Sequence, residues 1–421
     1  MSNFNLYEHC FVELEKYSYA DLAHTIDNYL FERGLCIREK DKLAFKFTGV
    51  FIYRNQFIIV FPKGYQIPKE DRILKQHIRT LINVLTRYSQ ENRLEPLEEE
   101  LLNGFGGQYE NVKDIFWLID DFVEHGLIDI QQSSYILNGG SNISWARTIK
   151  SVTPIISNQR PVYLDLVTKK NNVDYNNLIT KIHYYVINNC LNLYGWLFDY
   201  ELNSISDTED LPCDKDLALH LLDIEIQKTF ADREITLLNT LKRFIVGNNE
   251  GSQSSIFTYA TPYFHWVWEK ICYSLFMGQL KKDPLLKLPK PYWEVNDKRA
   301  YTEQIPDILF ESEHTLYILD AKYYSINYAP FKLPGWGDLV KQFFYAYTLR
   351  EKIHKDKDIK NIFIFPGQSD DDIEYLGHAS LEGETSLGKI NGFTLDVYRA
   401  MEHYVSYEEG NFKKKLLGLK I

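Results

Sequence analysis

The chain has 421 residues, 45% of them hydrophobic and 15% aromatic, so it is long enough for two or three domains with well-packed cores. Its formal charge of −11 argues against a nucleic-acid partner, because basic side chains make the phosphate contacts that supply much of the affinity. No basic-then-apolar leader is present, and no apolar run approaches the roughly 20 residues of a membrane span, which predicts a soluble, cytoplasmic protein without membrane contact. Five scattered cysteines without a CxxC pair predict buried thiols rather than disulfides or a zinc site.

The charge is unevenly distributed along the sequence. Residues 145–185 hold six Lys and Arg against two Asp, a local balance of 6 − 2 = +4. Acidic residues gather elsewhere, in 95–100, 207–216 and 368–374. One basic face could therefore bind a polyanion while the rest stays acidic, although these segments could equally be ordinary solvated surface.

The first part of the chain alternates helical and strand patterns. Apolar spacing predicts a helix over 8–32, with Gly34 as its stop signal. Residues 42–65 are rich in Val, Ile, Phe and Tyr around a polar Arg-Asn-Gln turn, which predicts a β-hairpin. A second helix is expected over about 69–92.

A further helix is expected to end at Gly126 and to lead into a hairpin formed by 127–130 and 133–137. A helix followed by a hairpin is typical of a winged helix, a common DNA-reading module, but any helix-then-hairpin segment gives the same pattern.

The middle of the chain predicts two long helical segments, about 174–198 and about 215–246. Residues 247–255, GNNEGSQSS, are the clearest linker. After it, helices and strands alternate, which predicts an α/β (α+β) mixed sheet flanked by helices. The expected elements are a helix at about 262–277, strands at 305–311 and 315–323, a helix at about 337–353, a strand at 361–365, a polar loop, a strand at 392–398 and a short C-terminal helix.

The stretch IPDILFESEHTLYILDAKYY, residues 305–324, places acidic and basic side chains in apolar strands. A hairpin turning between Glu313 and His314 pairs Asp307 with Asp320. Because strand side chains alternate between faces, Asp320 and Lys322 point the same way, so the three polar groups converge. Each also has a structural explanation, Asp320 and Lys322 as a surface pair and Asp307 as a strand-end cap.

Two neighbouring carboxylates repel each other, so their place in apolar strands is explained if a cation neutralises them. Oxygen ligands of this kind suit Mg²⁺, which keeps several waters and bridges to substrate phosphate. Such an ion activates water and stabilises charge on a phosphate oxygen, and Lys322 would assist. The residue set therefore predicts metal-assisted phosphodiester hydrolysis.

The arrangement Pro306-Asp307, twelve residues, then Asp320-Ala321-Lys322 resembles the PD-(D/E)xK nuclease superfamily. The resemblance implies a restriction-endonuclease-like fold. It also implies a metal-supporting acid on the preceding helix, for which Glu269 is the candidate. It implies polar contacts to the metal and the DNA backbone from the following helix, by Lys341 and Gln342. Glu269 could equally pair with Lys270 on the surface, and Gln342 could be a solvated or capping amide.

Residues of about 135–365 together resemble the LlaJI family of type II restriction endonucleases, on the segments SNISWARTIKSVTPIISNQRPVYLDLVTKK, VINNCLNLYGWLF, YFHWVWEKIC and the PD…DAK hairpin. The resemblance implies a Mg²⁺-dependent enzyme that cuts double-stranded DNA at a short site shared with a protecting DNA methyltransferase. It also implies that the chain acts with a second copy of itself or with a second nuclease subunit.

These patterns predict two domains. Residues 1–150 would recognise DNA and residues 151–421 would form the nuclease domain with a helical lead-in. Trp145, Arg147 and Lys150 mix an aromatic ring with basic groups and are candidates for gripping DNA, although a Trp packed at a domain junction would look the same.

Other signals are weaker. GETSLGKI, residues 383–390, mimics a phosphate-binding loop but has Ile390 where Ser or Thr is needed and is followed by a strand, so nucleotide binding is not expected there. The histidines lack metal-ligand spacing, and no Ser or Cys nucleophile elbow occurs. Two alternatives remain: a nuclease subunit of a repair or modification-dependent complex that needs a partner NTPase, and a catalytically inactive DNA-binding subunit.

Overall fold

The computed structural model describes most of the chain, in sixteen segments. These are residues 10–13, 29–39, 42–53, 56–103, 112–128, 131–140, 142–157, 159–173, 177–195, 210–247, 256–277, 289–324, 326, 333–352, 357–407 and 411–419. The chain divides into two compact units. The first contains residues 1–107 and 253–421, and the second contains residues 108–252. The predicted boundary near residue 150 thus falls inside the second unit, and the predicted linker 247–255 spans the end of that unit, with 248–255 outside the described residues. The division of labour between recognition and cleavage stays a prediction.

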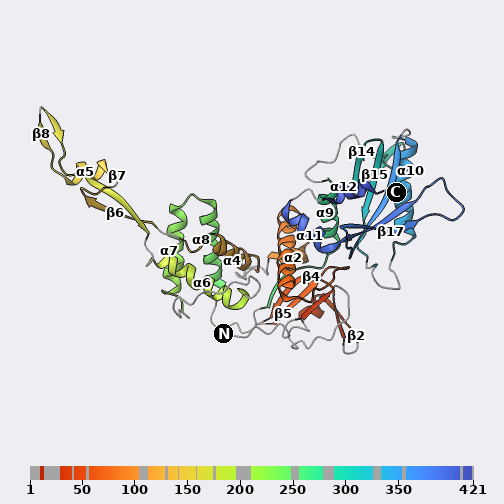
Figure 1. The fold of residues 1–421 in the computed structure, drawn as a ribbon, viewed down its shortest axis with the longest axis horizontal. Helices are drawn as coiled ribbons and strands as arrows, with labels where there is room; N and C mark the ends of the chain where they lie inside the picture. The colour runs from red at the N-terminus through yellow and green to blue at the C-terminus, as the bar shows by residue number, and fades with distance from the viewer. Residues whose placement is uncertain are drawn as a thin grey trace. The chain divides into compact units, whose positions relative to one another are not determined.

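A four-stranded sheet forms one half of the first unit, in the order β1 (Cys10–Glu13), β5 (Gln56–Phe61), β4 (Thr48–Tyr53) and β11 (Ile256–Thr261). Strands β4 and β5 are antiparallel neighbours, so the predicted hairpin is confirmed. In the sequence β11 follows the second unit, and it pairs with β4, which precedes that unit. This sheet therefore joins distant parts of the sequence (Figure 1).

The start of the predicted helix over 8–32 is wrong, because Cys10–Glu13 form β1, parallel to β5. Residues 29–32 are helical, Gly34 follows with φ 65°, and 14–28 lie outside the described residues. A four-residue segment such as CFVE is too short to assign by periodicity, and here its pairing with β5 makes it a strand.

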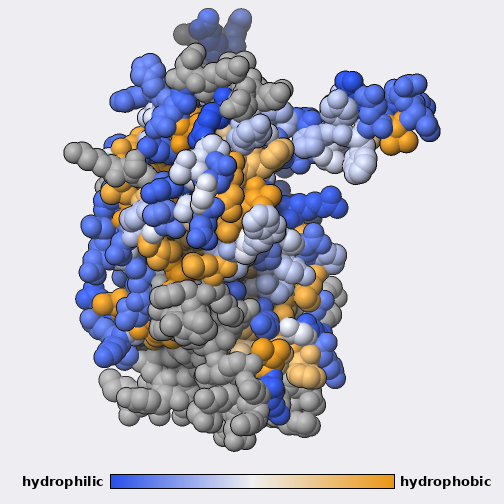
Figure 2. All heavy atoms as spheres, turned by 90° about the vertical axis from the view of Figure 1, so that its right-hand side faces the viewer, coloured by the Kyte–Doolittle hydropathy of each residue, from blue (hydrophilic) through white to orange (hydrophobic). Residues whose placement is uncertain are grey.

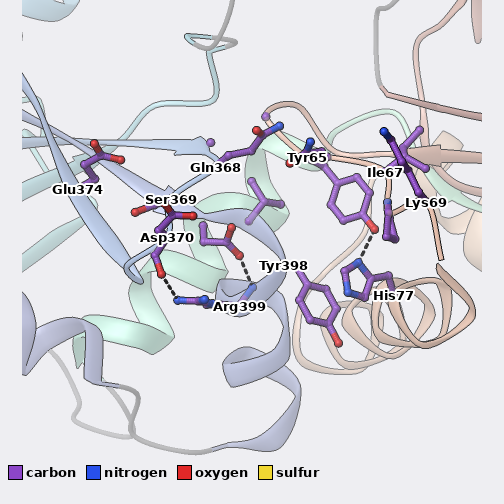
Figure 3. A pocket seen from close by; sticks show the side chains of 16 residues that line it. Tyr65, Ile67, Lys69, His77, Gln368, Ser369, Asp370, Glu374, Tyr398 and Arg399 are labelled. Carbon is purple, nitrogen blue, oxygen red and sulfur yellow. Dashed lines mark hydrogen bonds between the residues drawn. The ribbon is translucent and has the colours of Figure 1, made fainter. Parts of the chain in front are cut away.

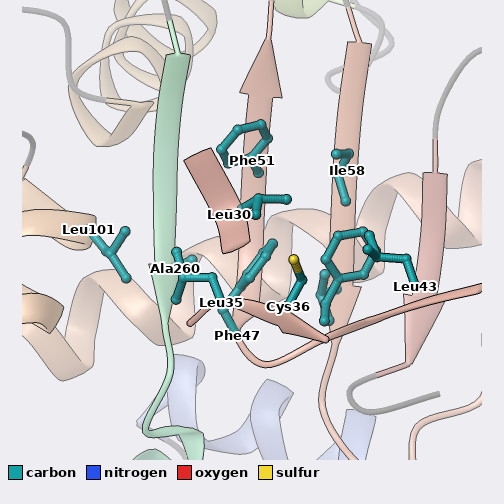
Figure 4. Close-up of a cluster of buried hydrophobic side chains, with 11 residues drawn as sticks. Leu30, Leu35, Cys36, Leu43, Phe47, Phe51, Ile58, Leu101 and Ala260 are labelled. Carbon is teal, nitrogen blue, oxygen red and sulfur yellow. The ribbon is translucent and has the colours of Figure 1, made fainter. Parts of the chain in front are cut away.

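The sheet packs into a buried hydrophobic cluster shown in Figure 4. A short hairpin of β2 (Cys36–Glu39) and β3 (Lys42–Phe45) and the helix α3 (Pro96–Asn103) contribute to it. The predicted second helix is α2 (Asp71–Glu91), which buries one apolar face. Labelled members of the cluster are Leu30, Leu35, Cys36, Leu43, Phe47, Phe51, Ile58, Leu101 and Ala260.

The other half of the first unit is a mixed five-stranded sheet, as the alternation of elements predicts. Its outer pairs are antiparallel and its two inner pairs are parallel. The order is β14 (Ile308–Ser312), β15 (Thr315–Ala321), β16 (Asp358–Gly367), β18 (Ile390–Asp396) and β17 (Ile373–Ala379).

Helices cover both faces of this sheet. α10 (Trp336–Lys352) packs Tyr345, Ala346 and Leu349 on Leu316 and Ile318 of β15. The strand residues between those that face α10 point to the other side of the sheet. That side faces α9 (Phe264–Met277) and α12 (Asn411–Gly418), where Lys413 lies over the Phe310 ring. A separate two-stranded hairpin, β12 (Tyr292–Val295) with β13 (Lys298–Tyr301), precedes β14.

Two expectations for the C-terminal segment are corrected. The expected polar loop contains β17, an edge strand in which Glu374, Tyr375 and Leu376 are all exposed, so it lacks the alternating burial that would mark a strand. The expected strand over 392–398 ends at Asp396, whose Oδ1 accepts a hydrogen bond from the Arg399 backbone at 2.8 Å and caps α11 (Val397–Ser406).

The second unit contains the helices α4 (Val112–His125), α6 (Leu178–Tyr194), α7 (Lys215–Lys228) and α8 (Asp232–Gly247). The single helix expected over 215–246 is wrong: it is broken at Thr229, which is extended, and α7 and α8 pack on each other. No Pro or Gly marks this break. Arg233 binds Asp121 through two hydrogen bonds of 2.6 and 2.8 Å, which joins α8 to α4.

The same unit contains a small sheet in the order β6 (Gln131–Leu137), β10 (Val167–Val173) and β7 (Asn142–Ile143). The helix α5 (Trp145–Ser151) and the hairpin of β8 (Ile155–Ser157) with β9 (Arg160–Val162) lie between its strands in sequence. β6 pairs with β10, not with the segment after Gly126, of which residues 129–130 lie outside the described part. The winged helix stays a prediction.

Among the coloured residues in Figure 2, hydrophobic side chains form patches between hydrophilic ones (Figure 2). Of the helices in the described segments, none has the length and apolar character required to span a bilayer.

Candidate active site

The β14–β15 hairpin has the register that the sequence predicts. Ile308 pairs with Leu319 and Ser312 with Thr315, around a turn in which Glu313 has φ 54°. Continued by one residue, this register puts Asp307 opposite Asp320. The Asp307 Oδ2 accepts a hydrogen bond of 2.8 Å from the Ala321 backbone, which ties it to the end of β15.

Asp320 is a buried carboxylate surrounded by cations. Asp320 is only 2% exposed, and its Oδ1 lies 2.9 Å from Lys322 Nζ. Its Oδ2 lies 3.8 Å from Lys341 Nζ on α10. The predicted convergence of Asp320 and Lys322 on one face of β15 is therefore present in the structure.

Asp307 and Glu269 are held in an environment that disfavours their charge. Burial, and then the charge of Asp320, raise the pKa of Asp307 to about 7. The same two causes, in the same order, raise the pKa of Glu269, while Lys270, Lys322 and Lys341 lower it. Glu269 therefore shares the electrostatic environment of the hairpin carboxylates, which a surface partner of Lys270 alone would not.

Lys322 is held by a second acid that the sequence did not point to. Its Nζ lies 2.8 Å from Asp338 Oδ1, and the other oxygen of Asp338 accepts a hydrogen bond of 2.9 Å from Tyr324. Burial lowers the pKa of Lys322, but the charge of Asp320 and the bonds to both carboxylates outweigh it and raise that pKa overall. Lys322 is thus a fixed ammonium group at neutral pH.

Gln342 occupies the buried side of α10. Its Nε2 donates to Asn361 Oδ1 at 2.7 Å and lies 3.3 Å from the Ile362 carbonyl and 3.4 Å from the Ile318 carbonyl. Its Oε1 has no hydrogen-bond partner within the described part of the chain. These contacts connect α10 to β15 and β16; the predicted contact with the metal or the DNA stays a prediction.

The donor set suits a small divalent cation. Asp320 Oδ2 is buried without a hydrogen-bond partner among the described residues, and burial together with the charge of Asp320 raises the pKa of both Asp307 and Glu269. Over the described ranges, no three His, Cys, Asp or Glu side chains converge into a complete ligand set. Mg²⁺ usually takes only one or two carboxylates and keeps several waters, so a pair such as Asp307 and Asp320 would match its usual ligand number.

Comparison with known proteins defines the family. The sequence model of the LlaJI restriction endonuclease family matches residues 47–388, most of the chain. The chain belongs to this family. The match includes the catalytic candidates from Glu269 to Gln342 and the strands β6 to β10 of the second unit.

Relatives of this LlaJI family protein include the "Type II restriction enzyme BsuMI component YdjA" of Bacillus subtilis (strain 168). It is 26% identical over 345 residues, which cover 78% of this chain and 73% of the relative. Among solved structures, McrC bound to McrB AAA+ hexamers of Thermococcus gammatolerans aligns with TM-score 0.41 and 13% identity over 95% of this chain and 99% of the other. The McrBC complex of the same organism aligns with TM-score 0.26 and 13% identity, over 60% and 83% respectively.

The predicted DNA contacts of the LlaJI family protein lie in different places. Trp145, Arg147 and Lys150 are exposed on α5 in the second unit, where the Arg147 guanidinium lies 3.7 Å from the centre of the Tyr135 ring. Lys341 lies in the first unit, at the carboxylates. The Trp145 side chain is 55% exposed, which is unlike a ring packed in a junction within its own unit.

Proposed function

We propose that this chain is the nuclease component of a type II restriction enzyme, and that it hydrolyses phosphodiester bonds of double-stranded DNA at a short specific sequence with Mg²⁺. The observation that carries the proposal is Asp320, a buried carboxylate facing Asp307 and held between Lys322 and Lys341. Membership of a restriction endonuclease family supports the same chemistry.

Each residue has a role that follows from its surroundings. Asp307 and Asp320 would hold Mg²⁺. Glu269, which interacts electrostatically with both carboxylates, would add negative charge that attracts the ion. When bound, the ion would supply positive charge at a phosphate oxygen and acidify a water molecule. Lys322 stays protonated, so it orients the attacking water and stabilises negative charge rather than acting as a base.

Plasmid cleavage tests this proposal directly. The purified chain, with Mg²⁺ and without nucleotide, should linearise plasmids that carry its target, while Asp307→Ala and Lys322→Ala should lower the rate at least about 100-fold. Lys414→Ala, an exposed change in α12, is the matched control and should cut normally. Variants that cut as fast as the wild type would rule out this assignment.

The printed name of the Bacillus subtilis relative, a "component", favours a second candidate in which cleavage needs another subunit. That subunit would be a second nuclease chain or an NTPase of a repair or modification-dependent complex. A purified chain that binds Mg²⁺ but cuts only after a partner protein is added would select this candidate. A cognate DNA methyltransferase would protect the same target from either enzyme.

A further inference from the structure

A cavity of about 500 Å³ in the first unit has a basic lining. Arg33, Lys46, Lys63 and His265 line it together with the rings of Tyr263 and Tyr323, and no Asp or Glu is among the described residues that line it. Arg33 also pairs with an acid outside the lining, since its Nε lies 3.4 Å from Glu100 Oε1. The cavity therefore has a strong preference for an anion.

The cavity adjoins both elements that carry the proposed catalytic residues. Tyr323 directly follows Lys322, so their Cα atoms lie about 3.8 Å apart. Phe264 and His265 line the cavity at the start of α9, the helix that carries Glu269. The N-terminal end of α9 adds a partial positive charge to the basic side chains.

Lys63 and Tyr323, which both line this cavity, contact each other. Lys63 Nζ lies 5.2 Å from the centre of the Tyr323 ring, and the Lys63 backbone donates a hydrogen bond of 2.8 Å to the Tyr323 hydroxyl. Tyr323 in turn packs on Phe264, with ring centres 5.7 Å apart. Aromatic rings beside ammonium groups suit a nucleotide unit, because the rings contact sugar or base while the cations contact phosphate.

A second cavity in the same unit lacks this selectivity. It has about 640 Å³ and is lined by Lys69 and Arg399 but also by Asp370, Glu374 and Asp396 (Figure 3). Arg399 is already bound to Asp372 at 3.1 Å. The balanced charges make it a poor phosphate site.

We infer that the basic cavity binds a backbone phosphate of the DNA strand that enters the active site, with Lys46 and Lys63 as its contacts. This inference rests on the proposed nuclease function and adds a substrate-binding site to it. The two lysines would position the strand next to the carboxylates and Lys322 without touching the reacting phosphate.

Salt-dependent DNA binding by the full chain tests the inference. Binding is measured in the Asp307→Asn background, which prevents cleavage, with and without Lys46→Ala and Lys63→Ala. Each lost phosphate contact lowers the slope of log K against log salt by about 0.9, so the double variant should lose nearly 2 in slope. The affinity gap to the parent should narrow about tenfold between roughly 50 and 200 mM salt.

The matched control removes two lysines elsewhere in the same unit. Lys357→Ala with Lys414→Ala changes the charge equally, and Lys357 already pairs with Glu311 at 2.5 Å. This control should bind with the parental slope. Thermal unfolding checks the fold of every variant, and Lys63→Met, which keeps an aliphatic stem over the Tyr323 ring, replaces Lys63→Ala if the latter does not fold.

Parallel measurements separate the outcomes. If the wild type cuts plasmid while the double variant keeps the parental slope, the phosphate site is rejected and the nuclease proposal stands. If the slope falls as expected but the wild type alone never cuts, cleavage by the chain alone is rejected and the phosphate site stands. Displacement of DNA by millimolar inorganic phosphate alone, equally in parent and double variant, would overturn the assignment of the cavity to DNA.

Discussion

Asp320 is an acidic residue that is 2% exposed and lies on an apolar strand, where a carboxylate is stable only beside compensating cations. The structure supplies Lys322 and Lys341 but leaves Asp320 Oδ2 without a hydrogen-bond partner in the described segments. Burial and the neighbouring charge of Asp320 also raise the pKa of Asp307, to about 7. The Mg²⁺ proposed above would neutralise the carboxylates at this end of the hairpin.

Asp307→Asn should therefore have opposite effects on stability and on metal response. At pH 8 without metal, it removes a buried ionised group and should raise the melting temperature, by about 2–4 °C for each kcal/mol gained. Millimolar Mg²⁺ should stabilise the wild type, because a ligand that binds only the folded state raises its stability, and should leave the variant unchanged. Differential scanning fluorimetry with and without Mg²⁺ measures both. Equal Mg²⁺ responses would contradict a metal site at Asp307.

Asp338 is the site residue that sequence reasoning missed. Asp307, Asp320 and Lys322 were predictable, because strand alternation and the turn at Glu313 determine their register. Asp338 contacts Lys322 only because α10 docks on this face of the sheet, and no local pattern encodes that contact. The available signal was an acidic residue in the first turn of the helix that follows the motif. This signal is ambiguous, because acids are common in the first turn of any helix, where they interact favourably with the helix dipole.

Asp338→Ala should slow cleavage about 10- to 100-fold, because Lys322 and Tyr324 lose the group that orients them. Steady-state kinetics should show the loss mainly in kcat. Asp338→Asn keeps one of the two acceptor oxygens and should recover part of the rate. A wild-type rate for the alanine variant would show that Lys322 needs no such support.

Among the elements, α10 shows how one helix serves packing and chemistry together. Its inward side chains fill the space above Leu316 and Ile318, while Asp338 and Lys341 lie at the carboxylates. Gln342 is fully buried and forms hydrogen bonds with residues of both β15 and β16, so it fixes the position of α10 on the sheet. Helix periodicity alone left Gln342 open between a capping amide and a ligand.

Gln342→Ala should lower the free energy of unfolding by about 1–3 kcal/mol, because it leaves the Asn361 amide and two strand carbonyls without their donor. Urea denaturation measures the loss. Thr348→Ala, a smaller change on the same helix whose hydroxyl bonds only within α10, is the comparison. Unchanged stability with lost cleavage would instead support the predicted contact with the metal or the DNA.

Long, strongly periodic elements were predictable, and those decided by distant partners were not. The spans of α2, α9 and α10 agree with apolar spacing within a few residues. β1 and β17 escaped because an edge strand is decided by its neighbour in the sheet. The break between α7 and α8 escaped because it carries no Gly or Pro and forms where the two helices pack on each other.

On the scale of the whole chain, each of the two units has its own buried core, so unfolding should occur in two transitions. His183 belongs to the second unit, and its Nδ1 accepts a hydrogen bond of 3.1 Å from the Ile128 backbone. Burial lowers the pKa of His183 to about 4, against 6.5 when it is exposed. Between these values the unfolded chain binds a proton that the folded unit does not.

The stability of the second unit should therefore fall as the pH drops from about 6.5 to 4. The lost stability is at most on the order of 3 kcal/mol from this residue. His183→Asn, which keeps an acceptor but does not titrate, should flatten the pH dependence of one transition and leave the other unaltered. Scanning calorimetry from pH 4 to 7 measures it, and a single transition at every pH would contradict the division into two units.

The pairing of β4 with β11 has a consequence for biosynthesis. Tyr53 pairs with Ile256, so the first sheet lacks one strand until about 200 further residues have been translated. At the usual 5–20 residues per second the ribosome needs roughly ten to forty seconds for that stretch. During this interval the inserted unit can fold while the edge of the nascent β4 stays unpaired, and an unpaired strand edge is a site where other chains can add a strand.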